Sequence, residues 1–125
     1  MVTADIAQLT GECSGWRNTL RDERSQLTSL KEKLQALSSN LLDRSTLQDL
    51  EHLQNQFYIQ LINVHDLKHA IKEHEQIAAW ENEKNGQATD ATWAAHEELH
   101  NQYDHLHYTI GQVKQEFKQF VSRLQ

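Results

Sequence analysis

Eight histidines and one cysteine give this 125-residue chain the side chains of a zinc site. Imidazole nitrogens and a thiolate sulfur are ligands that zinc commonly takes in proteins. His96 and His100 are four residues apart, a spacing that places both imidazoles on one face of a helix. The segment that they bound reads His-Glu-Glu-Leu-His and matches the H-E-x-x-H pattern of zinc proteases. Because the match is short and no third-ligand motif follows it, we favour a non-catalytic interpretation.

These side chains are carried by long helices, because apolar residues recur at alternating steps of three and four along almost the whole chain. Such steps average about 3.5 residues, which keeps one stripe of a helix facing its neighbours over many turns. The sequence therefore predicts an all-α fold, an antiparallel up-down-up three-helix bundle that forms one domain over residues 1–125. We expect the centre of its core to hold Leu30, Phe57, Val64, Ile110 and Phe117.

Capping and turn residues predict where each helix begins and ends. Thr3 and Ser45 are N-cap residue types that precede the first two apolar runs. Gly86 follows an asparagine and predicts a helix stop, since glycine accepts the left-handed conformation found there. Thr89 or Asp90 then caps the third helix. The predicted helices span about residues 3–40, 45–85 and 89–124.

Two glycines, Gly11 and Gly15, lie inside the first predicted helix. Each weakens a helix by roughly 1 kcal/mol relative to alanine. The apolar pattern passes through both positions without a change of phase. We therefore expect one continuous helix rather than a break followed by a fourth helix.

Three heptad-patterned helices with Trp16 in the first and Trp93 in the third resemble a spectrin repeat. The resemblance is architectural, covers the whole chain and implies the same three-helix unit. The chain differs from that family in having one unit and in placing Trp93 near the start of its helix rather than well inside it. The segment 65–75 also resembles small uncharacterised helical proteins of bacteria, a likeness that implies no activity.

Short connections force neighbouring helices to run antiparallel, so residues equally far from a turn lie at the same level. This register brings Cys13, His74 and His100 together, with His96 beside them. We predict that these four residues are either a non-catalytic zinc site or, as we favour, core and rim side chains satisfied by glutamate, glutamine or water.

Two further polar groupings occur near the apolar seams. The register pairs Glu23 with His107, which predicts a buried or half-buried hydrogen-bonded pair that fixes how the helices align. His65, His69 and Glu73 could join the histidines of the third helix in a di-iron site like that of hemerythrin. Such sites need four shorter helices with every ligand pointing inward, so we do not favour this alternative.

The second predicted helix carries a second apolar stripe, in which histidines lie between the apolar residues. On a helical wheel its members lie well away from the first stripe, which faces the other helices. This position predicts a solvent-exposed interface. Alternatively, the second helix contacts two neighbours and therefore has a wide buried face, which includes part of the stripe. The candidate interface residues are Tyr58, Ile62, His65, His69 and Trp80.

Composition limits the functions that the chain can have. It carries 18 acidic against 12 basic residues, a net charge of −6, which argues against nucleic acid as a partner. There is no apolar stretch of about 18 residues to span a membrane and no secretory signal, so we expect a cytoplasmic protein. We predict a non-enzymatic interaction or scaffold protein without a cofactor, with a second copy or another protein as its partner. The alternative is a small zinc-binding protein.

Overall fold

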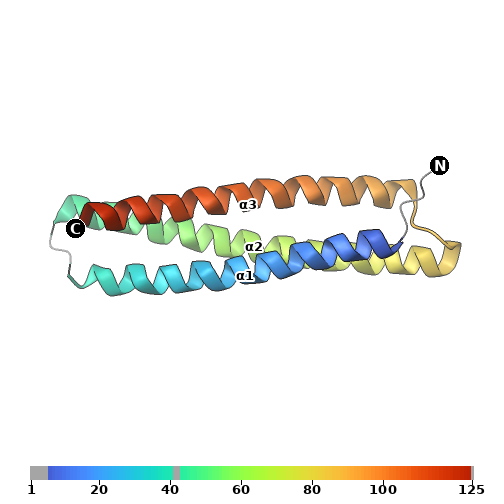
Figure 1. Ribbon diagram of the computed structural model, residues 1–125, viewed down its shortest axis with the longest axis horizontal. Coiled ribbons are helices and arrows are strands. Elements are labelled where there is room, and N and C mark those ends of the chain that lie inside the picture. The colour runs from blue at the N-terminus through green and yellow to red at the C-terminus, as the bar shows by residue number, and fades with distance from the viewer. Residues whose placement is uncertain (1–5, 41–42, 125) are drawn as a thin grey trace.

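The computed structural model describes residues 6–40 and 43–124, which form three long helices (Figure 1). They are α1 (Ile6–Ser38), α2 (Arg44–Asn85) and α3 (Asp90–Leu124). The chain reverses direction at each connection, so α2 runs antiparallel to both α1 and α3 (Figure 1). No strand occurs in the described ranges. The predicted all-α three-helix bundle is confirmed, and α1 is continuous through both of its glycines.

The start of α2 differs from the sequence prediction, because Asp43 rather than Ser45 is the N-cap. The Asp43 carboxylate accepts hydrogen bonds from the Thr46 N–H at 3.0 Å and from the Thr46 hydroxyl at 2.9 Å. A carboxylate is favoured at this position because it also faces the positive end of the helix dipole. The bond from the Thr46 N–H holds the pKa of Asp43 below its ordinary value. The other predicted cap, Thr3, lies outside the described residues.

The turn between α2 and α3 is held by side chains from both helices. Gly86 ends α2 at a φ of 79°, and its N–H donates to the Asn82 carbonyl at 2.8 Å, as the predicted stop requires. Thr89 caps α3 by accepting the Thr92 N–H at 3.2 Å. Glu81 of α2 accepts from the Thr89 N–H at 2.9 Å and from the Thr92 hydroxyl at 2.5 Å. These bonds fix the end of α2 to the start of α3.

The core is a seam of leucines and aromatics along the facing sides of the helices. Of the predicted central residues, Phe57, Val64, Ile110 and Phe117 are buried, and the Phe57 and Phe117 rings pack with centroids 5.8 Å apart. Leu30 is only partly buried, so that part of the prediction is wrong. It lines a groove between α1 and α3, the two helices that contact each other least, and Phe117 lines the groove with it.

Replacing Phe57 with alanine removes a fully buried ring and leaves a cavity against Phe117. We expect the variant to lose about 3–5 kcal/mol of unfolding free energy, measured by chemical denaturation. Ile77→Ala is the matched control, because this apolar side chain of α2 is exposed and its truncation should change stability by less than about 0.5 kcal/mol. Equal losses in the two variants would place the buried face of α2 elsewhere.

Glycines 11 and 15 of α1 can be replaced without steric conflict. A Cβ built at either position meets nothing within 4 Å, and both positions are exposed. Alanine removes the conformational freedom that glycine has in the unfolded chain, so we expect the double variant Gly11→Ala, Gly15→Ala to gain about 1–2 kcal/mol in unfolding free energy. Circular dichroism during denaturation measures this gain. A loss of stability would show that α1 needs glycine here.

Candidate functional site

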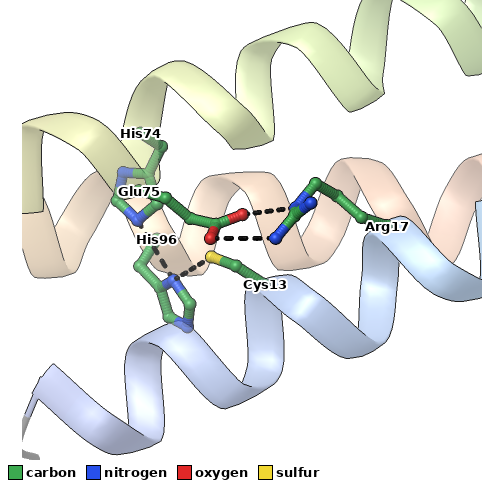
Figure 2. Close-up of polar contacts among 5 residues, drawn as sticks. All are labelled: Cys13, Arg17, His74, Glu75 and His96. Atoms are coloured by element: carbon green, nitrogen blue, oxygen red, sulfur yellow. Dashed lines mark hydrogen bonds and ion pairs between the residues drawn. The ribbon is translucent and has the colours of Figure 1, made fainter.

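A buried cluster of one cysteine and two histidines lies between the three helices, near the start of α1 (Figure 2). It contains Cys13 of α1, His74 of α2 and His96 of α3, whose side chains are 0%, 6% and 6% exposed. One sulfur and two ring nitrogens, one from each residue, all lie within 4.8 Å of one another. Each helix therefore contributes one side chain to a single site.

His96 is the centre of the cluster. Its Nδ1 lies 3.1 Å from His74 Nε2 and 3.8 Å from Cys13 Sγ, and its Nε2 lies 3.0 Å from the Glu12 carboxylate (Figure 2 shows the first two contacts). An ionised carboxylate can only accept, so His96 Nε2 carries the proton and donates it to Glu12. In neutral His96 the Nδ1 lone pair then accepts from His74 Nε2–H and from the Cys13 thiol.

Burial keeps two members of the cluster, Cys13 and His74, uncharged near neutral pH. It raises the pKa of the Cys13 thiol to about 12, an effect that the nearby Glu75 carboxylate reinforces and Arg17 opposes. Burial also lowers the pKa of His74, and the neighbouring His96 lowers it further. The thiol is therefore protonated and His74 is neutral at pH 7.

Aromatic rings and an ion pair close the cluster. The Trp16 ring stacks on His96 with centroids 4.8 Å apart, and the edge of Trp93 meets the same imidazole at 5.5 Å. On the other side Arg17 donates to both oxygens of Glu75, at 2.5 and 3.1 Å (Figure 2). The two helices that carry this pair, α1 and α2, are thereby linked directly beside the cluster.

His100 does not join the cluster, although the sequence register placed it there. Its side chain is half exposed, lies 3.2 Å from Asp104 and packs against Trp16. The reason is rotation: His96 occupies the seam, Leu99 is the next seam residue, and His100 lies about 100° further round the helix. The H-E-x-x-H segment therefore does not direct two imidazoles to one point.

The histidines of α2 that the di-iron alternative requires are also away from the core. His65 and His69 are exposed, and His69 Nε2 lies 3.2 Å from the Glu73 carboxylate one turn on. Glu12, by contrast, is a contact of the cluster that the sequence did not indicate. It adjoins Cys13 in the chain, and only the packing of α1 on α3 brings its carboxylate to His96.

The second polar pair that the register predicted is present. Glu23 Oε1 and His107 Nδ1 form a hydrogen bond between α1 and α3. Glu23 is buried whereas His107 is more than half exposed, so the pair is half-buried. The other carboxylate oxygen of Glu23 has no hydrogen-bond partner among the residues that the structure describes.

The apolar strip of α2 is largely open to solvent, although the Lys31 ammonium of α1 lies over the Tyr58 ring, 5.8 Å from its centroid. Its large side chains are substantially exposed, with 56% of Tyr58, 43% of Ile62 and 59% of Trp80 accessible to solvent. His65 and His69 lie between them and are exposed too. The alternative of a wide buried face therefore does not hold for these five side chains, which all lie outside it. We call Tyr58, Ile62, His65, His69 and Trp80 the α2 strip.

Comparison with models of protein families found no match, and comparisons with curated proteins and with solved structures found none either. The resemblance to a spectrin repeat therefore stays an architectural prediction. None of the helices, over the residues that the structure describes, has an apolar stretch long enough to cross a membrane.

The lowered pKa of His74 makes folding stability depend on pH. In the unfolded chain this histidine takes up a proton near its ordinary pKa of 6.5, whereas in the fold it does so only at lower pH. The unfolded state thus binds more protons in that window, and stability falls as pH drops from about 6.5 towards the folded pKa. Denaturation at several pH values, with a chelator present, measures this slope.

We expect His74→Gln to flatten this dependence, because an amide does not titrate yet can still donate to His96 Nδ1. His100→Gln is the matched control, since that imidazole is half exposed and outside the cluster. An unchanged slope in His74→Gln would mean that other groups cause the pH dependence.

Proposed function

We propose that this protein is a non-enzymatic interaction protein that pairs with a second copy of itself through the α2 strip. The observation that carries the proposal is the exposure of Tyr58, Ile62 and Trp80 along one side of one helix. From Tyr58 to Trp80 the strip extends about 33 Å at 1.5 Å per residue. Exposed aromatic anchors at the two ends of such a strip are typical of protein interfaces.

The spacing of the strip favours a helix as the partner. Starting at Tyr58, the steps along this side of α2 are four, three and four residues up to His69. From His69 they are again four, three and four, through Glu73 and Gln76 to Trp80. The pattern repeats every 11 residues and its steps average about 3.67, close to the 3.6 residues of one helical turn, so it keeps a stripe against a neighbouring helix.

The same spacing is symmetric about His69, which favours a second copy running antiparallel. A two-fold axis at His69 would bring Tyr58 level with Trp80 of the second copy, and His65 level with Glu73 of the second copy. Aromatic rings would then pack at both ends, and an imidazole would meet a carboxylate between them. A parallel pairing would instead place the Glu73 carboxylates of both copies opposite each other, which is unfavourable.

The non-enzymatic part of the proposal rests on access. Cys13, which has the side chain of a nucleophile, is fully buried, and its thiol is protonated at neutral pH. A thiolate, rather than a thiol, attacks substrates. The chemistry that its histidine neighbours suggest is therefore closed to a substrate from solution, whereas the α2 strip is open.

Light scattering after size-exclusion chromatography tests this pairing. We expect the wild type to have twice the mass of one chain and the double variant Ile62→Glu, Trp80→Glu to have the mass of one, because two buried carboxylates would oppose association. Tyr108→Glu is the matched control, since this exposed aromatic lies on α3, outside the strip, and its loss should leave the dimer intact.

Two outcomes would contradict the proposal. One is a wild type that stays monomeric at high concentration. The other is a double variant that melts far below a monomeric wild type, which would make the strip part of the core. Oxidative cross-linking tests the axis separately: His69→Cys should form a disulfide-linked dimer, whereas Asn101→Cys, exposed on α3, should not.

A further inference from the structure

We propose that Cys13, His74 and His96 bind one Zn²⁺ ion that ties the three helices together. Each ligand comes from a different helix, so a single ion would cross-link α1, α2 and α3 at one level. The site lies on the inner side of the bundle, away from the α2 strip, and does not depend on the proposed dimer. A thiolate and two imidazoles are a ligand set that suits zinc better than calcium or magnesium.

The distances between the ligand atoms fit a tetrahedral ion. With Zn–S of about 2.3 Å and Zn–N of about 2.0 Å, a tetrahedron requires about 3.5 Å between sulfur and nitrogen and about 3.3 Å between two nitrogens. The corresponding separations are 3.8 Å from Cys13 to His96 and 3.1 Å from His74 to His96. The third edge, between Cys13 and His74, is no longer than 4.8 Å, so it needs to shorten by about 1.3 Å at most.

The imidazole of His96 is already held in the form that binds a metal. Glu12 accepts the Nε2 proton at 3.0 Å, which leaves the Nδ1 lone pair directed at the other two side chains. A carboxylate on the far nitrogen of a ligating histidine is the usual support of zinc sites. It fixes both the tautomer and the orientation of the ring.

Hydrogen bonds alone satisfy this cluster poorly. The single lone pair of His96 Nδ1 faces two donors, His74 Nε2–H and the Cys13 thiol, and the sulfur is 3.8 Å away. A Zn²⁺ ion would replace both hydrogens. The Cys13 S–H bond would break and its proton would leave to the solvent as the Zn–S bond forms. The His74 proton would move through solvent from Nε2 to Nδ1, which frees Nε2 to coordinate.

The surrounding charges favour a cation. The Glu12 carboxylate lies 3.0 Å from His96 Nε2, and Glu75 directly follows His74 in the chain, so two carboxylates create a negative potential beside the cluster (Figure 2 shows Glu75). The same potential that disfavours a lone thiolate stabilises a doubly positive ion together with that thiolate. Arg17 offsets only part of it, because its guanidinium is already paired with Glu75. A water molecule would complete the fourth position.

Zinc titration of the untagged, metal-free protein by calorimetry tests the site. We expect one ion per chain and a rise in melting temperature on binding. Cys13→Ser and His96→Gln should each lose this binding, and Glu12→Gln should weaken it by about 10–100-fold. His100→Gln is the matched control: this histidine is the nearest one outside the cluster in sequence, and its replacement should leave binding unchanged.

Cobalt substitution keeps the test decisive if a ligand variant unfolds. Co²⁺ bound to the wild type should show the intense visible bands of a tetrahedral site and a thiolate-to-metal charge-transfer band in the near ultraviolet. Absence of stoichiometric binding, or binding without the thiolate band, would overturn the proposal. So would loss of binding in His100→Gln, because the ion would then be held by surface histidines.

Discussion

Burial of one continuous apolar stripe on each helix is the constraint on which the rest of this structure depends. A short helix can bury its apolar face in several orientations, but helices of 33, 42 and 35 residues must keep theirs facing inward over many turns. Rotating any of them would expose a whole row of leucines and aromatics to water. The seam therefore fixes the rotation of each helix, and with it the direction of every polar side chain that replaces a seam residue.

This constraint also determines which groups lie next to the polar residues of the seam. Glu23, Gln60, His74 and His96 are all buried at positions where an apolar residue is expected. Each lowers stability unless it finds a partner, and the partner that it finds restricts how the helices can slide. The unpaired oxygen of Glu23 shows that the compensation is incomplete. We regard these layers as fixing the register, because leucine at the same positions would be compatible with several alignments.

The sequence predicts the fold well and the site only in part, for a physical reason. Periodicity depends on burial over dozens of residues, so a single irregular position does not obscure it. Membership of the cluster depends on a small rotation round a helix. Counting from the turns could not separate His96 from His100, which are one turn apart and differ by only about 40° in direction. The N-cap of α2 was ambiguous for a similar reason. Asp43 and Ser45 are two residues apart, both are suitable N-cap residue types, and the structure uses Asp43. No local sequence pattern predicted the contact of Glu12 with His96, because this contact depends on how α1 packs against α3.

The two faces of α2 can be altered independently, and this follows from the geometry of the seam. The residues that pack inward, such as Phe57 and His74, lie on the side of the helix that touches α1 and α3, whereas Tyr58 and Ile62 are turned towards solvent. A substitution on the outer face leaves the buried cluster untouched, and an ion bound in the cluster leaves the outer face available. The inner cluster and the outer strip share no residue, so a variant that removes one of them leaves the other in place.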